Sequence, residues 1–148
     1  MNGVGWWSLV RFLHVAGAVV WVGGQLTLTL VVLPLARRSL SDEARDRFAA
    51  AAGRRFGMLT GAVFLPLQLA TGWAMACHRG VTWASLADPG YGRTLATKLG
   101  LFVLVMLAAA GHGIAYARGR AELARTLAVV SLVGSLGVVL LATALPAT

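Results

Sequence analysis

Two histidines lie where the surrounding sequence is strongly apolar. His14 and His112 each fall inside a long run of residues with the length and composition of a membrane-spanning helix. An ionisable side chain is costly in hydrocarbon, so in such a helix it usually marks a cofactor, an ion pathway or a proton relay. An imidazole can bind haem iron or a metal ion, or it can simply bond to a neighbouring protein group. The two histidines are therefore the first candidates for chemistry.

Further candidates lie near the end of one apolar run and beside His14. Met75, Cys77 and His78 combine a thioether, a thiol and an imidazole, a set that suits Cu(I). Arg11 precedes His14 by one helical turn, where its guanidinium could pair with a haem propionate. The alternative for Arg11 is a side chain that extends to the lipid headgroups.

Two more polar residues share a helix face with a histidine. Gln25 follows His14 by eleven residues, which returns it to nearly the same face, and Trp21 shares that face. Lys98 lies within about 40° of His112. Gln25 is also a candidate hydrogen-bond partner for His112. Lys98 is either a ligand or a lysine that reaches the membrane interface.

The elements that must position these groups are four stretches without a formally charged side chain. The chain of 148 residues is 58% hydrophobic and only 12% charged. Each stretch has roughly the 20 residues that cross about 30 Å of hydrocarbon, and in lipid such segments must be helical. The charge-free stretches are 12–36, 56–77, 99–117 and 126–148, and the spans built on them are expected at 9–35, 56–77, 95–117 and 125–146. The sequence thus predicts an all-α, integral membrane four-helix bundle in one domain, 1–148.

The basic residues predict the orientation of this bundle. The net charge is +8, but the charges gather at the ends of the apolar runs, which does not favour nucleic acid as a partner. Six arginines lie in 37–55 and three in 118–125, against four basic residues elsewhere. Short loops rich in Lys and Arg stay in the cytoplasm, so both termini should lie outside. The expected location is the bacterial cytoplasmic membrane.

Local patterns predict details of the helices. Ser41 with Asp42 and Glu43 is typical of a helix start, and we expect a short surface helix there. Pro66 should kink the second helix. Small residues should allow close helix packing; they are Gly57 and Gly61, and in the fourth helix Ser131, Gly134, Ser135 and Gly137.

The depth of each polar residue limits the chemistry. At 1.5 Å per residue, His14 and His112 differ by roughly 15 Å in depth, so they should not bind the same iron. The outer layer is expected to hold His14, Gln68, Met75, Cys77, His78 and Lys98, and the inner layer Gln25 and His112. The single cysteine excludes an internal disulfide, and the absence of CxxCH excludes a c-type haem.

The chain resembles two families of membrane proteins. The first is the copper-resistance protein D (CopD) family, through Arg11-Phe-Leu-His14, Trp21-Val-Gly-Gly24, Leu33-Pro34, Arg37-Arg38, Gly53-Arg54-Arg55-Phe56, Ala70-Thr71-Gly72, Tyr91-Gly92-Arg93, Lys98 and His112. The layout is also similar to HemJ-type protoporphyrinogen oxidases, which share a His in helix one and a Lys near the start of helix three. This resemblance implies that His14 is a ligand of b-type haem. The chain departs from the HemJ pattern after Leu33-Pro34-Leu35 and at the entry to helix four.

These observations lead to three expectations about function. The first is a b-type haem protein that transfers electrons at the outer face, with His14 as one axial ligand and His78, Lys98 or Met75 as the other. A second haem would use His112. The second expectation is copper binding or transport through His14, Met75, Cys77 and His78, and the third is a non-catalytic subunit of a membrane complex. Whether the protein is a haem-dependent oxidoreductase is left open. Besides the lipid bilayer, the candidate partners are a quinone, a redox protein and a second copy of the chain.

Overall fold

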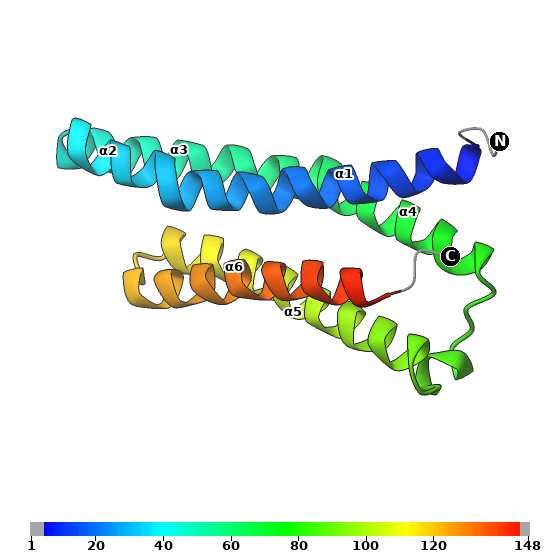
Figure 1. The fold of residues 1–148 in the computed structure, drawn as a ribbon. Helices are drawn as coiled ribbons and strands as arrows, with labels where there is room; N and C mark the ends of the chain where they lie inside the picture. The colour runs from blue at the N-terminus through cyan, green and yellow to red at the C-terminus, as the bar shows by residue number, and fades with distance from the viewer. Residues whose placement is uncertain (1–4, 146–148) are drawn as a thin grey trace. The chain divides into compact units, whose positions relative to one another are not determined.

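The computed structural model describes residues 5–145, and these residues are helical with no strand (Figure 1). The chain divides into two compact units, one ending at Arg79 and the other beginning at Gly80. Four continuous helical stretches are long and apolar enough to cross a membrane. The expected helical fold with four such stretches is therefore confirmed. The organisation as one domain stays a prediction.

The first unit contains two long helical stretches that lie side by side (Figure 1). The first stretch is built from α1 (Trp6–Thr27), the π-helical segment η1 (Leu28–Val32) and α2 (Leu33–Ser39). The second is built from α3 (Asp42–Leu59), the π-helical segment η2 (Thr60–Phe64) and α4 (Leu65–His78). Only Leu40 and Ser41 separate the stretches, so they must run in opposite directions.

Both π-helical segments have the same cause. Pro34 and Pro66 each follow a π segment by two residues. Proline lacks the backbone N–H, and its ring clashes with the carbonyl four residues earlier. A wider π turn accommodates the ring without ending the helix. At Pro66 the structure thus has a π segment inside a continuous helix, and the kink expected there stays a prediction.

The start of the second stretch confirms one expectation and corrects another. Ser41 caps the helix by accepting a hydrogen bond from the backbone N–H of Ala44 at 3.4 Å, with Asp42 and Glu43 in the first turn. The expectation of a short surface helix is wrong, however. The helix that begins at Asp42 continues through η2 to His78, because 42–59 contains no proline that would end it.

The second unit contains the 3₁₀ turn η3 (Ala84–Ala87), α5 (Tyr91–Ala117) and α6 (Ala121–Ala144). A turn at Asp88-Pro89-Gly90 separates η3 from α5. Gly119, with a φ of 70°, turns the chain between α5 and α6, a conformation that suits glycine. The fourth span was expected to reach 146, but α6 ends at Ala144, and residue 146 lies outside the described residues.

Small residues bring α5 and α6 together. A Cβ atom on Gly134 would lie 2.5 Å from Cγ2 of Val105, and one on Gly137 would lie 3.0 Å from Cδ2 of Leu101. The close helix packing expected at Gly134 and Gly137 of α6 is therefore confirmed. Gly57 and Gly61 differ, because a Cβ on either would meet no described atom within 4 Å. Close packing at that GxxxG pair is therefore not found among residues 5–145.

Candidate functional site

His14 lies at the contact between α1 and α4. Its ring is half-buried, and its Nδ1 atom is 2.8 Å from Oγ1 of Thr71, a buried residue of α4. The hydroxyl of Thr71 also donates a hydrogen bond to the carbonyl oxygen of Leu67 at 2.6 Å. His14 is thus held by a side chain from the neighbouring helix, which is itself anchored to its own backbone.

These two bonds determine which nitrogen of His14 carries a proton. A threonine hydroxyl has one hydrogen, and the short contact to Leu67 requires it because a carbonyl oxygen can only accept. Thr71 Oγ1 must therefore accept a hydrogen bond from Nδ1–H of His14. In the neutral ring with this tautomer, the lone pair lies on Nε2, the nitrogen that would bind a metal ion.

A second contact holds the backbone at His14. The amide nitrogen of Gln68 donates to the carbonyl oxygen of His14 at 2.7 Å, and Gln68 is only 8% exposed. Its amide lies against Gly17, where a Cβ atom would come within 2.6 Å of Nε2 of Gln68. Gly72 makes room for the imidazole, since a Cβ there would lie 3.3 Å from Cε1 of His14. The two glycines therefore allow the polar groups of both helices to meet.

A further polar contact lies deeper in the same unit. The indole N–H of Trp21 donates to Oγ1 of Thr60 at 3.1 Å, and the hydroxyl of Thr60 donates to the carbonyl of Phe56 at 2.9 Å. The Trp21 ring stacks on Phe64 with centroids 4.6 Å apart. His14 and Trp21 were expected on one face of the first helix, and both face α4 or η2. That expectation is confirmed.

The C-terminal end of α4 carries the residues considered for copper. The His78 ring stacks on Trp7 with centroids 3.7 Å apart and an interplanar angle of 17°. Met75 and His78, three residues apart, share a helix face, whereas Cys77 is exposed and lies about 200° around the helix from Met75. No group of three His, Cys, Asp or Glu side chains suited to a metal ion is found among residues 5–145. The structure thus does not bring Cys77 together with the other two residues.

Arg11 and Gln25, two other expected residues of the first unit, lie on α1 before and after His14. Arg11 is exposed on α1, one turn before His14. Gln25 is half-buried eleven residues further along the helix, about 16 Å away along its axis. Arg11 and Gln25 therefore lie on opposite sides of the histidine along α1.

His112 belongs to the second unit and has a different partner. Its Nδ1 atom is 2.8 Å from the backbone carbonyl of Ala124 in α6. A carbonyl only accepts, so Nδ1 must be the protonated nitrogen here as well. The Tyr116 ring lies at a tilt, 6.4 Å from the imidazole centroid. Lys98, the other candidate of this unit, is half-buried on α5.

The residues that determine the site chemistry include two, Thr71 and Gly72, that the sequence offered only within the resemblance to CopD, as Ala70-Thr71-Gly72. Thr71 assigns the tautomer of His14, and Gly72 leaves space beside the ring. A signal was available, because Thr71 follows Gln68 by three residues and therefore lies on the same face of the helix. A threonine in a membrane helix is common, however, and only the packing distinguishes this one.

Comparisons with known proteins give one relative. The chain is 31% identical to an uncharacterized protein of Aquifex aeolicus over 107 residues, which cover 72% of this chain and 68% of that protein. No family model matches the chain, and no solved structure matches it.

Proposed function

We propose a function for this chain, which belongs to the same family as the Aquifex aeolicus protein: it is an integral membrane protein that binds b-type haem through His14. The four apolar helical stretches support its place in a membrane. The nine arginines of 37–55 and 118–125 support an orientation with both termini outside. His14 then lies near the outer face, in the first helix.

The contact between His14 and Thr71 is the observation that carries this proposal. Oγ1 of Thr71 accepts a hydrogen bond from Nδ1–H of His14, so the lone pair of the neutral ring lies on Nε2. Metal-binding histidines usually donate their other N–H to a fixed acceptor in this way, which orients the ring and raises its basicity.

The surroundings of His14 hold its ring in place and offer a partner for a propionate. Gly72 allows the imidazole to lie against α4, since a Cβ atom there would come within 3.3 Å of Cε1. Arg11 lies one turn nearer the outer surface, where its guanidinium can pair with a propionate. When bound, a b-type haem supplies an iron that accepts and releases one electron.

Met75 would be the second residue to hold the haem. Thr71 marks the level of His14 on α4, and Met75 follows it by about 6 Å along the axis, whereas His78 follows by about 10 Å. The ring of His78 is also stacked on Trp7. Lys98 belongs to the second unit and stays an alternative ligand. His112 offers the same tautomer as His14, which supports a second site for haem in that unit.

The first test is the visible absorption spectrum of the full chain, purified after haem-replete expression. We expect a Soret band that is lost in His14→Ala, kept in His78→Ala, and altered in position or intensity in Thr71→Val. The Met75→Leu variant should change the spin state without removing the band. Absence of a Soret band in the wild type, or an unchanged band in His14→Ala, would disprove haem binding at this site.

Copper binding of the CopD type is the alternative that the same preparation can decide. Elemental analysis of the wild type is compared with a Met75/Cys77/His78 triple alanine variant. Copper present in the wild type and lost in the triple variant, without a Soret band, would replace the haem proposal. Haem present with no copper would support it.

A further inference from the structure

An apolar groove lies in the first unit, between the first helical stretch and α3. Its volume is about 380 Å³. The lining comes from α1 and η1 on one side and α3 on the other: Gly24, Thr27, Leu28, Ala52, Arg55, Phe56 and Leu59. Arg55 is the charged residue among those that line the groove, and Thr27 provides a hydroxyl group. The groove thus pairs an apolar floor with a single guanidinium.

The groove depends on a close approach at Gly24. A Cβ atom on Gly24 would lie 2.7 Å from Cε2 and 3.4 Å from Cζ of Phe56. The phenyl ring therefore lies against the backbone of α1 and forms the floor. Ala52, Phe56 and Leu59 recur at three- and four-residue spacing, which places them on one face of α3.

The position of Arg55 along the helix corresponds to one surface of the bilayer. The apolar stretch that follows it ends at Cys77, twenty-two residues later, which is about 33 Å of helix. The hydrocarbon core is about 30 Å thick, so Arg55 lies at the level of the lipid phosphates when Cys77 lies at the opposite boundary. Phe56 and Leu59 then lie at the level of the acyl chains.

Charge also favours an anionic occupant. The acidic residues nearby are already paired, because Arg45 contacts Asp42 at 2.8 Å and Asp46 at 3.2 Å, and Arg47 contacts Glu43 at 2.8 Å. Among residues 5–145 no ion pair involves Arg55. The segment 37–55 carries six arginines against three acids, so its field is positive.

We infer that this groove binds one anionic phospholipid of the cytoplasmic leaflet. Arg55 donates two N–H groups to the phosphate, and the Thr27 hydroxyl donates to a phosphate or ester oxygen. One acyl chain lies over Phe56 and beside Gly24, toward Leu59. The inference goes beyond the proposed function and rests on its membrane orientation but not on haem binding, since Arg55 is about 24 Å along the helix from the level of His14.

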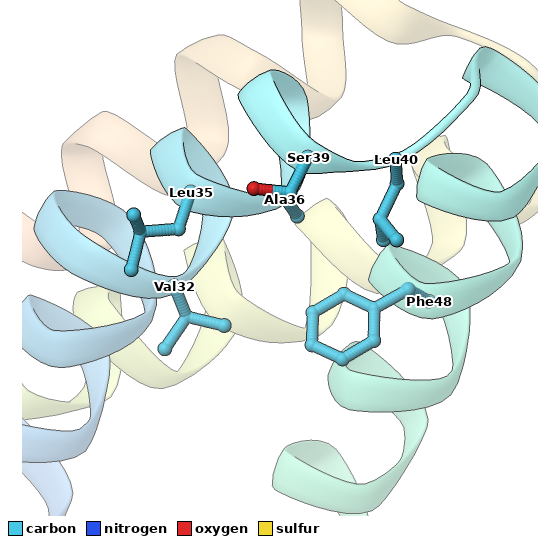
Figure 2. Close-up of a pocket in the computed structure, with 6 residues that line it drawn as sticks. All are labelled: Val32, Leu35, Ala36, Ser39, Leu40 and Phe48. Carbon is cyan, nitrogen blue, oxygen red and sulfur yellow. The ribbon is translucent and has the colours of Figure 1, made fainter.

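A neighbouring cleft shows why the inference is limited to one groove. This second cleft, of about 290 Å³, is lined by Val32, Leu35, Ala36, Ser39, Leu40 and Phe48. In Figure 2 the Phe48 ring reaches toward the helix that carries Val32, and no cationic side chain is among the six residues drawn. Such a cleft can accept an apolar chain but has no group to retain a phosphate.

Native mass spectrometry of the full chain can test the inference. The protein is reconstituted in nanodiscs that contain equal amounts of palmitoyl-oleoyl phosphatidylglycerol and phosphatidylcholine, and is then released. We expect one phosphatidylglycerol to stay bound to the wild type. Arg55→Gln should weaken its retention about tenfold, as expected for the loss of a charge-assisted hydrogen bond. Arg54→Gln is the matched control, because it removes the same charge one residue away and outside the groove.

A second pair of variants tests the shape of the groove without changing its charge. Gly24→Ala should displace Phe56 and reduce retention, whereas Gly53→Ala, where a Cβ meets no atom within 4 Å, should retain the lipid. Equal loss in Arg54→Gln and Arg55→Gln would show a diffuse charge effect and overturn the site. Equal retention of phosphatidylglycerol by the wild type and Arg55→Gln would also overturn it. The same holds if phosphatidylglycerol is not preferred over phosphatidylcholine, or if the protein is a dimer without bound lipid. A bound haem would appear as a separate mass, so this result and the haem result are read independently.

Discussion

The two units of the chain hold their helices together by different means. In the first unit, the contact between helices includes side-chain hydrogen bonds from His14, Trp21 and Gln68. In the second unit, α5 and α6 approach mainly through glycines, with Val105 fully buried against Gly134, and His112 of α5 also bonds to the carbonyl oxygen of Ala124 in α6. The helices also differ in length, with 34 and 37 residues in the first unit and 27 and 24 in the second.

This difference indicates where function can be located. A contact made by close packing can do little except hold two helices, and adding a single methyl group disturbs it. A contact made by polar groups in lipid needs every donor matched, which selects specific side chains and specific tautomers. The first unit therefore carries the stronger candidate site. The following predictions compare the two types of contact, from the largest expected effect to the smallest.

The largest effect is expected where the first turn of α5 contacts η3. A Cβ atom on Gly92 would overlap the backbone carbonyl of Ser85, which cannot move as a side chain can. Gly92→Ala should lower the free energy of unfolding by about 3 kcal/mol. The measurement is unfolding in mixed micelles with increasing dodecyl sulfate, followed by circular dichroism. Gly100→Ala is the control; because its Cβ meets no atom within 4 Å, it should not destabilise. Equal stability of the two variants would contradict the close approach.

A somewhat smaller loss is expected within the packed helix pair. Gly134→Ala places a Cβ atom 2.5 Å from Val105, a branched and fully buried side chain. Overpacking of this kind should cost about 2 kcal/mol in the same assay. Gly113→Ala, which has open space at its Cβ, is the matched control. If Val105→Ala in the Gly134→Ala background did not recover stability, the contact would not be the cause.

The polar contact of the first unit should have an intermediate effect. Thr71→Val removes the hydroxyl and leaves Nδ1–H of His14 without its acceptor, which should cost about 1.5 kcal/mol. Thr71→Ser keeps the hydroxyl and should recover most of the loss. A double-mutant cycle with His14→Ala measures the coupling between the two residues. Additive effects in that cycle would mean that the two side chains do not interact.

The smallest effect is expected for the deeper hydrogen bond. Trp21→Phe removes the indole N–H that donates to Thr60 but retains an aromatic ring for stacking on Phe64. The loss should be about 0.6 kcal/mol, the average for a hydrogen bond between membrane helices. Trp21→Ala, which also removes the stacking, should cost about 3 kcal/mol. A Phe variant as unstable as the Ala variant would assign the stability to the hydrogen bond instead.

Much of the fold could be predicted because lipid restricts the available structures. Charge-free runs of about 20 residues must be helical, and the expected spans 56–77 and 95–117 lie within helical stretches of the structure. Helical periodicity also placed His14 and Trp21 on one face. The extent of the second stretch was not predicted, because the charged segment that begins at Asp42 was expected to end before the membrane.

The candidate site was only partly predictable. The sequence by itself determined that a histidine lies in an apolar helix, since this follows from composition and the 3.6-residue period. Only the tertiary structure decided that Thr71 is its partner, that Nδ1 carries the proton, and that Gly72 adjoins the ring. The physical reason is that hydrogen-bond direction depends on atoms from two helices 57 residues apart in the chain, whose relative rotation is set by packing. A periodic pattern along one helix contains no information on that rotation.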